Sequence, residues 1–447
     1  MREGLRAIRH AFASREPANV ARLQRARFAE MVAFARARSP YYRELYRNLP
    51  ERVEDPRMLR MLPTTDKPKL MSRFDEWVTD HDATLDKVSA FVGNPELIGE
   101  RFLGKYTVLT TSGTTGTSGT FLLDDHAMAV SAAMLLRMAS TVFGLGDIAR
   151  ILLRRWRMAN VVATGGHYAA AVAAAQHPKA IRNFAVDAPL AELVDQLNGF
   201  RPVVFGGYAS TVVLLAGEQA AGRLAIDPVL VIPIAEGLAP DEYDRIAKVF
   251  SAKVHTSYAA TECPFLSYDC EYRWLHVNSD WVALEPVDAD YQPTPAGEQS
   301  HTVLVTNLAN RVQPILRYDL GDSILARPDP CPCGNPLPAI RVQGRSAEVL
   351  SFTTPDGKQV AIPPLALEVD HIPGVLLYQV VQTTPTSLCV RLRLAPAADP
   401  DRTWQQVHEQ LSRLLATHNL DHVAVERSAE SPEQTTGGKY RAVVPLS

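Results

Sequence analysis

The stretch TVLTTSGTTGTSGTF, residues 107–121, consists almost entirely of small hydroxyl-bearing residues and glycine: twelve of its fifteen residues are Ser, Thr or Gly. Backbone N–H groups in a turn that glycine permits converge on an anion, and Ser and Thr hydroxyls donate further hydrogen bonds to it. A phosphate-binding loop is therefore the first hypothesis, and a linker is the alternative. Because no Lys follows Gly116 or Gly119, the stretch does not match the G-x-x-x-x-G-K-[ST] pattern of P-loop nucleotidases.

The composition is that of an ordinary globular protein. The chain has 447 residues, of which 46% are hydrophobic and 21% charged, so we expect two or three domains. A formal net charge of -3 provides no global positive field for nucleic acid or for an anionic membrane. The basic run Arg154–Arg157 is interpreted as a solvated face.

No targeting or membrane segment is predicted. The first twenty residues contain no apolar core long enough for a signal peptide, and no window approaches the ~20 apolar residues of a membrane span. We therefore expect a cytoplasmic protein. Five cysteines form no disulfide framework, and in a reducing compartment clustered thiols are more typical of metal ligands.

The middle of the chain alternates between two patterns. Residues 20–47 have helical periodicity with an expected stop at Ser39-Pro40. From about 105 to 260, β-rich runs such as 203–205 and 229–232 alternate with Ala/Leu-rich helical stretches. This alternation predicts βαβ units and a largely parallel sheet.

The last third changes character twice. Residues 274–327 carry two apolar runs around a Pro/Gly/Asp-rich turn region, which predicts antiparallel strands. After Gly344-Arg345 we expect a small α+β unit with strands within 377–394 and a helix over 403–417. The predicted fold class is therefore α/β, with a large part over 1–344 that has mixed sheets and helices and a small unit over 345–447.

Five motifs resemble those of one superfamily, in its order. TSGTTGTSG is similar to the phosphate loop of adenylate-forming enzymes, the acyl-CoA synthetase and adenylation-domain superfamily. The others are SYAATE (257–262), RYDLGD (317–322), RVQGRSAE (341–348) and TTGGKYR (435–441). Within the superfamily the chain most resembles phenylacetate-CoA ligase and its relatives, through ARSPYYRELY, LPTTDKPKL, TNLANRVQPILRYDLGD and CPCGNPLPAIRVQGR.

The resemblance implies an ATP site. The loop would close over the β- and γ-phosphates with Thr111, Ser112, Gly113, Thr114, Thr115 and Gly116. Glu262, which would hold Mg²⁺, Thr261 and the mobile Lys439 are the implied catalytic residues. Asp322 and Arg345 would contact the ribose, Tyr258 would stack on adenine and Glu236 would lie beside it. The resemblance also implies that the 345–447 unit is a mobile cap carrying the lysine loop.

The implied reaction is adenylation of a carboxylic acid, aryl or arylacetic by likeness, followed by transfer to CoA. We expect the acid near His167, Tyr208 and Ala259, among mostly small residues. The hinge has Ala347 where the family has its first Asp, so adenylation is better supported than thioester formation. Transfer to a carrier protein or an amine is one alternative, and an idle nucleotide-binding scaffold is another. A homodimer is possible.

A second site is expected around four metal-binding side chains. Cys331-Pro332-Cys333 is a tight two-thiol turn, and DCEYRWLH supplies Cys270 and His276 in a stretch that resembles the same ligase subgroup. Three thiolates and one imidazole form a closed tetrahedral set for structural Zn²⁺. Buried free cysteines are the alternative.

Overall fold

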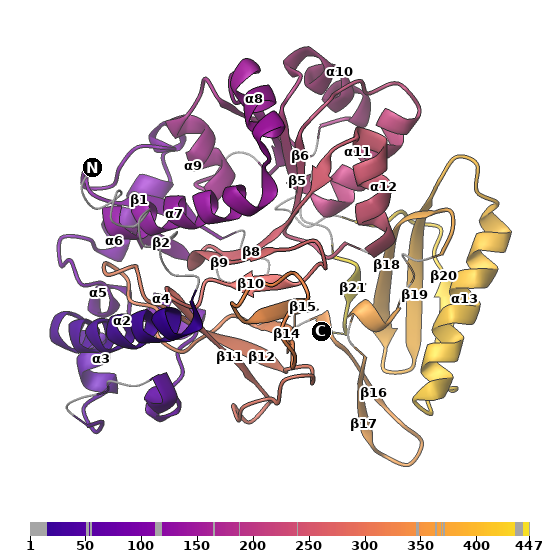
Figure 1. The fold of residues 1–447 in the computed structure, drawn as a ribbon. Coiled ribbons are helices and arrows are strands. Elements are labelled where there is room, and N and C mark those ends of the chain that lie inside the picture. The colour runs from indigo at the N-terminus through magenta and orange to yellow at the C-terminus, as the bar shows by residue number, and fades with distance from the viewer. Residues whose placement is uncertain are drawn as a thin grey trace.

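The computed structural model describes residues 16–50, 53, 56–111, 119–163, 166–186, 188–238, 240–345, 348–362, 364–367, 369, 372–433 and 441–446. Figure 1 shows a parallel-sheet layer covered by helices, with antiparallel sheets beside it. The C-terminal unit, in yellow, lies at the right of the view.

Two consecutive helices open the described chain. The long helix α2 (Pro17–Arg38) ends at Ser39, whose hydroxyl accepts a hydrogen bond from the Tyr42 amide and so caps α3 (Pro40–Leu45). The predicted break at Ser39-Pro40 is confirmed, because an N-cap side chain followed by proline starts a new helix. Short elements follow: η1 (Pro56–Met61), α4 (Lys67–Ser72), α5 (Phe74–Trp77), α6 (Leu85–Val92) and η2 (Pro95–Leu97).

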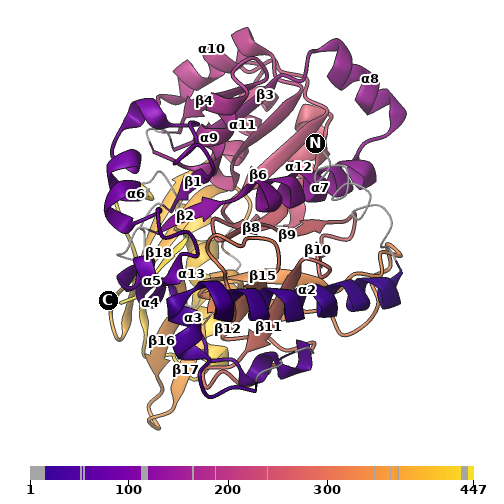
Figure 2. The ribbon, with the colours of Figure 1, turned by 90° about the vertical axis from the view of Figure 1, so that its left-hand side faces the viewer.

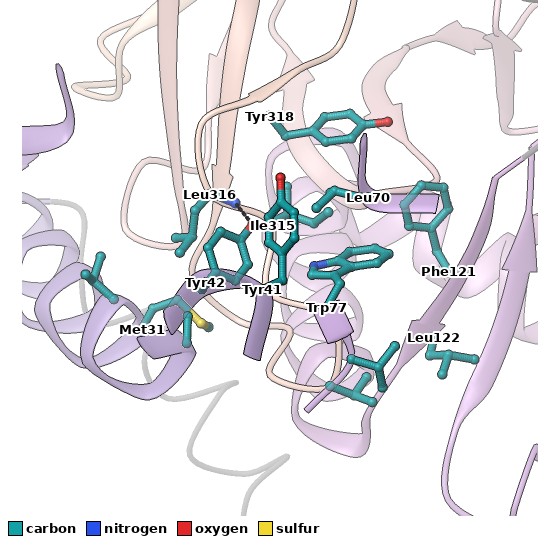
Figure 3. Close-up of a cluster of buried hydrophobic side chains, with 14 of the residues drawn as sticks. Met31, Tyr41, Tyr42, Leu70, Trp77, Phe121, Leu122, Ile315, Leu316 and Tyr318 are labelled. Atoms are coloured by element: carbon teal, nitrogen blue, oxygen red, sulfur yellow. Dashed lines mark hydrogen bonds between the residues drawn. The ribbon is translucent and has the colours of Figure 1, made fainter. Parts of the chain in front are cut away.

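This N-terminal region shares one core with residues 308–318. The Tyr42 hydroxyl and the Trp77 indole N–H both donate to the Pro314 carbonyl, at 2.9 and 2.7 Å. Figure 3 shows Tyr42 and Trp77 packed among Leu70, Phe121 and Leu316. These bonds satisfy a buried carbonyl with aromatic donors from two helices, so the N-terminal helices are fixed to the chain that carries the RYDLGD motif.

The predicted parallel sheet is confirmed. Its strand order is β4-β3-β5-β6-β7 and each described pairing is parallel. The strands are β3 (Met158–Val162), β4 (Ile181–Ala185), β5 (Val204–Tyr208), β6 (Leu230–Ile234) and β7 (Lys253–Val254). The accompanying helices are α7 (Asp125–Val142), α8 (Leu145–Leu153), α9 (Ala169–Gln176), α10 (Leu190–Phe200), α11 (Ala209–Ala220) and α12 (Pro240–Phe250).

The antiparallel strands predicted for 274–327 are also present. One sheet has the order β14-β15-β10-β9-β8, a second has β11-β12-β13, and β1 pairs with β2. The strands are β1 (Thr107–Thr110), β2 (Thr120–Leu123), β8 (Ser257–Ala260), β9 (Cys263–Asp269), β10 (Leu275–Val277), β11 (Val282–Val287), β12 (Thr302–Asn307), β13 (Tyr318–Asp319), β14 (Asp322–Ala326) and β15 (Ala339–Arg345).

The C-terminal unit has a core of its own, drawn from residues 350–443. The helix α13 (Pro400–Thr417) packs its buried Val407, Leu411 and Leu415 on a sheet of order β20-β19-β18-β21. The remaining elements are β16 (Leu350–Thr353), β17 (Gln359–Ile362), η4 (Pro364–Leu367), β18 (Val375–Thr384), β19 (Ser387–Leu394), β20 (Ala424–Arg427) and β21 (Val443–Val444).

A buried ion pair connects α7 to the turn before β11. Asp280 is fully buried and accepts two hydrogen bonds from the Arg137 guanidinium, each 2.9 Å long. Arg27 of α2 donates to the Asp280 backbone carbonyl and stacks on Trp281, with 3.3 Å from the guanidinium carbon to the ring centroid. Because both charges of the Arg137–Asp280 pair are buried, removal of either side chain is costly.

We expect Asp280→Asn to destabilise the protein by about 3 kcal/mol, since it removes the carboxylate that pairs with the buried Arg137 guanidinium. The control is Asp227→Asn, which breaks the surface pairs of Asp227 with Arg150 and Arg154 and is expected to change stability by less than about 1 kcal/mol. Urea unfolding measures both. Equal midpoints for the two variants would contradict the role given to the buried pair.

Candidate functional site

One group of predicted residues lies at the carboxyl ends of the central parallel strands. Tyr208 ends β5, and Glu236 follows β6 after Ala235, a non-glycine residue with a φ of 65°. The Glu236 carboxylate accepts a hydrogen bond from the Ser210 amide, 2.8 Å long, in the first turn of α11. The positive end of the helix dipole stabilises a carboxylate there. In parallel α/β sheets, this edge is the usual place for a ligand.

The SYAATE and RYDLGD motifs meet through one hydrogen bond. The Tyr258 hydroxyl on β8 donates to the Asp322 carboxylate on β14, at 2.7 Å. Both side chains are half-buried, and their strands are the two outer strands of one five-stranded sheet. This bond holds the phenol ring and the carboxylate in a fixed relation.

Glu262 is a buried carboxylate with two polar neighbours on the same oxygen. It is 7% exposed, and its Oε1 accepts a 2.7 Å hydrogen bond from the Tyr318 hydroxyl. The Lys67 Nζ lies 4.0 Å from that oxygen. Burial raises the pKa of Tyr318, and the Glu262 charge raises it further, so the phenol stays a donor. The arrangement fixes the carboxylate through Oε1.

Lys67 has no assigned role in the sequence prediction, although it stands in the quoted LPTTDKPKL. Thr65 forms an isolated parallel bridge with Tyr318, through hydrogen bonds of 3.0 Å to the Arg317 carbonyl and 2.8 Å from the Asp319 amide. This bridge brings the start of α4 to Glu262. A Cβ built on Gly119 would lie 3.4 Å from the Lys67 Cδ, so the lysine stem lies against the end of the Ser/Thr/Gly stretch.

The described ends of that stretch are closed on each other. The Thr111 amide donates to the Gly119 carbonyl at 2.9 Å, and the Gly119 amide donates to the Thr111 hydroxyl at 2.8 Å. The predicted loop residues between them, Ser112, Gly113, Thr114, Thr115 and Gly116, lie outside the described residues. Lys439 also lies outside them. Arg345 is described only as the last backbone position of β15.

The three predicted acid-pocket residues differ in exposure. Ala259 is exposed. Tyr208 is 7% exposed, its hydroxyl accepts from the Ala163 amide at 3.4 Å, and burial raises its pKa. His167 is 1% exposed, with its ring centroid 5.3 Å from that of Phe91, and burial lowers its pKa. In this structure a ligand reaches the His167 ring only if Phe91 or its neighbours move, so its contact with an acid stays a prediction.

The predicted metal-binding residues are brought together by β9, β10 and the 331–334 turn. One ligand atom from each of Cys270, His276, Cys331 and Cys333 lies within 4.8 Å of all the others. The Cys270 and Cys331 sulfurs are 3.7 Å apart. A tetrahedral ion with metal–sulfur bonds of about 2.3 Å places two thiolates about 3.8 Å apart. The spacing therefore fits a four-coordinate ion.

The imidazole in this cluster is oriented by its second nitrogen. His276 Nδ1 lies 3.0 Å from the Leu337 carbonyl, and Nε2 lies 3.2 Å from the Cys333 sulfur. Donation from Nδ1–H to the carbonyl leaves the Nε2 lone pair pointing into the cluster, the arrangement usual for metal-bound histidine. Burial lowers the pKa of His276 and raises that of Cys270 to about 12.

Comparison with known proteins identifies the fold. No protein-family model matches the chain. Protein CapK of Staphylococcus aureus is 27% identical over 134 residues, which is 29% of this chain and only 28% of CapK. A 2-hydroxyisobutyryl-CoA ligase in its postadenylation state, in complex with 2-HIB-AMP, is 20% identical with a TM-score of 0.68, covering 96% of this chain and 90% of that one. The chain has the adenylate-forming ligase fold.

Two further superpositions refine this likeness. The acyl acid amido synthetase AtGH3.15 is 12% identical with a TM-score of 0.62, covering 96% of this chain and 92% of that one. The 2-hydroxyisobutyryl-CoA ligase in its thioesterification state has a TM-score of 0.56 at 19% identity, over 96% and 90% of the chains. The chain therefore superposes better on that ligase in its postadenylation state than in its thioesterification state.

We expect purified protein to contain about one Zn²⁺ per chain, because the four ligand atoms converge with tetrahedral spacing. Cys331→Ser should lose most of the metal and lower the thermal midpoint, whereas Cys389→Ser, far along the chain in β19, should retain it. Elemental analysis checks both. Metal-free protein from a chelator-free preparation, with Cys331 and Cys333 readily alkylated, would contradict the metal site.

Proposed function

We propose that this chain uses ATP to convert a carboxylic acid into an acyl-adenylate and then transfers the acyl group to CoA. The observation that carries the proposal is the hydrogen bond between Tyr258 and Asp322 on strands β8 and β14, with the buried Glu262 in the turn after β8 and Glu236 after β6. Coming from three separate stretches of sequence, these side chains offer an aromatic face and three carboxylates, the groups needed to hold a nucleoside and a cation.

In this proposal each side chain has a role in nucleotide binding. Asp322 accepts from the ribose hydroxyls, and its bond to Tyr258 sets the phenol ring against the adenine. Arg345, at the end of β15, contacts the ribose as well. Glu236 lies beside the base. The loop residues Thr111 to Gly116 close over the β- and γ-phosphates, and Thr111 is held by its hydrogen bonds with Gly119.

Glu262 fits the role of Mg²⁺ ligand. Its Oε1 is taken by the Tyr318 hydroxyl, so Oε2 is the oxygen left for a cation, and a single carboxylate combined with substrate phosphates is a common Mg²⁺ arrangement. When bound, Mg²⁺ neutralises part of the triphosphate charge. Thr261 precedes this carboxylate and belongs to the same catalytic motif.

The reaction needs positive charge near the α-phosphorus. A carboxylate oxygen of the acid attacks the α-phosphorus, the bond to the bridging oxygen breaks, and pyrophosphate leaves with the electron pair. Lys439 stabilises the charge that accumulates on the attacking and α-phosphate oxygens, an electrostatic contribution without a covalent step. In the second half-reaction, the CoA thiolate attacks the acyl carbon and AMP leaves.

We propose that Lys67 replaces the lysine that the Ser/Thr/Gly loop lacks. Its stem lies against Gly119, and its ammonium is 4.0 Å from Glu262. A cation at this position faces both the loop that would hold the β- and γ-phosphates and the carboxylate that would hold Mg²⁺. Its charge therefore favours ATP binding and stabilises the departing pyrophosphate.

The acid is proposed to be aryl or arylacetic and to lie between the sheet edge and Ala259, near Tyr208 and His167. The unit from 345 to 447 is proposed to act as a mobile cap that carries the lysine loop, in line with its separate core. The Zn²⁺ proposed at Cys270, His276, Cys331 and Cys333 is structural, because four protein ligands leave no open position for a substrate.

A second candidate is an adenylating enzyme whose acceptor is an amine or a carrier-protein thiol. Two observations favour it: Ala347 replaces the expected hinge Asp, and the chain superposes on an acyl acid amido synthetase over 96% of its length. Consumption of CoA after adenylate formation separates the two candidates, since only the first one uses it.

The test of adenylation is acid-dependent exchange of labelled pyrophosphate into ATP, screened over aryl, arylacetic and short hydroxy acids. We expect exchange with at least one acid, and we expect Lys439→Ala to lower the rate by roughly two orders of magnitude or more while ATP binding persists. Absence of exchange across the panel while ATP still binds in calorimetry would instead favour the idle nucleotide-binding scaffold, and absence of both exchange and ATP binding would contradict the proposed site.

The role of Lys67 has a matched control on the same helix. Lys67→Met should lower the exchange rate by about a hundredfold and weaken ATP more than a preformed acyl-adenylate mimic, because the contact is with the departing group. Lys69→Met should change neither, since Lys69 is more than half exposed and pairs with Asp66. Equal behaviour of the two variants would remove Lys67 from the site.

A further inference from the structure

The basic run Arg154–Arg157 takes no part in the proposed site. It follows α8, a nine-residue helix with only one buried side chain, Ile151. Ile151 joins a small core with Val142, Val203 and Val229. Figures 1 and 2 show α8 at the outer edge of the parallel-sheet layer. One side chain therefore fixes the inner face of α8, and the rest of the helix is available to solvent.

The solvent face of α8 is apolar. Leu145, Ile148 and Leu152 recur at helical spacing, and Leu153 follows them. Leu145 and Leu153 are 89% and 83% exposed, and Trp156 after the helix is 52% exposed. Of the thirteen large hydrophobic side chains exposed in the described residues, seven lie between 135 and 156. Such a concentration is typical of a contact surface. We name Leu145, Ile148, Leu152, Leu153 and Trp156 the α8 patch.

The charges around the α8 patch are opposite in sign to the whole chain. The helix and the turn after it carry Arg150, Arg154, Arg155, Arg157 and Asp147. Asp227 pairs with two of these arginines, and Lys253 pairs with Asp147. Five cations against two carboxylates give this locality a net charge of +3, whereas the chain has -3. The partner of this surface is therefore expected to be anionic.

The turn that presents Trp156 is held in a costly conformation. Arg155 and Trp156 have φ angles of 56° and 54°, the left-handed region that non-glycine residues rarely adopt. The Trp156 amide donates to the Ile151 carbonyl at 3.1 Å, which ties the turn to the last turn of α8. This backbone bond keeps Arg155 and Trp156 next to the end of α8.

We propose that the α8 patch docks the protein on an anionic phospholipid surface. Leu and Trp side chains enter the boundary between head groups and acyl chains, and flanking arginines contact the lipid phosphates. Among the described helices none is long and apolar enough to cross a membrane alone, and α7 and α8, which reach that composition together, meet at 119°. The geometry therefore corresponds to a helix lying on the surface.

Other occupants fit the α8 patch less well. In a two-fold dimer built on this patch, each copy would face another region of charge +3, so like charges would oppose the contact. The backbone of a nucleic acid attracts cations. It does not bind four exposed aliphatic side chains and an indole. A lipid surface uses both the apolar and the cationic groups.

The experiment is co-sedimentation of the full chain with vesicles of phosphatidylglycerol and phosphatidylcholine in equal parts, and with phosphatidylcholine alone. We expect binding to the anionic vesicles, weakened by a rise in salt from about 0.1 to about 0.5 M. Leu153→Glu should weaken binding at least about tenfold and Arg155→Glu about fivefold or more. Both variants leave the adenylation residues in place, so exchange activity should persist in them.

The control is Met61→Glu, a substitution at a side chain that is 49% exposed on η1, and it should bind vesicles like the unchanged protein. Absence of binding to anionic vesicles would overturn the proposal, and so would binding that Leu153→Glu leaves unchanged. A dimer in light scattering that Leu153→Glu dissociates, without vesicle binding, would assign the patch to a second copy instead. The test is independent of the proposed reaction.

Discussion

The short parallel bridge between Thr65 and Tyr318 determines how the rest of the candidate site is assembled. Three hydrogen bonds join Thr65 to Leu316, Arg317 and Asp319. They place Lys67 next to Glu262 and fix Tyr318, whose hydroxyl orients that carboxylate. A buried carboxylate is costly unless it is hydrogen-bonded and paired, so these contacts stabilise the Glu262 carboxylate at 7% exposure.

Much of the fold follows from local pattern. The Ser39-Pro40 break, the alternation that gives β5 and β6, and the antiparallel pair β11 and β12 all depend on capping, periodicity and turn residues that are visible in sequence. Residue types also predicted the cluster of Cys270, His276, Cys331 and Cys333, because only a few side chains can form such a set. The family resemblance singled out Tyr258 and Asp322, but their hydrogen bond to each other was not predicted.

The remaining features depend on contacts between distant parts of the chain. Lys67 reaches Glu262 from 195 positions away, and no local pattern indicates that approach. The buried His167 contacts Phe91, which is distant in sequence, and the outward apolar face of α8 depends on which side the sheet covers. A leucine-rich helix with a basic end looks the same in sequence whether its leucines point inward or outward.

The central claim is that a carboxylate of the substrate attacks the α-phosphorus of ATP. The most direct measurement uses a substrate acid labelled with ¹⁸O in its carboxyl group, followed by mass spectrometry of the nucleotide product after complete turnover with CoA. The account predicts AMP carrying one ¹⁸O atom, because the bridging oxygen of the adenylate stays with AMP when the acyl group is transferred. Unlabelled AMP, or ADP together with labelled phosphate, would contradict it.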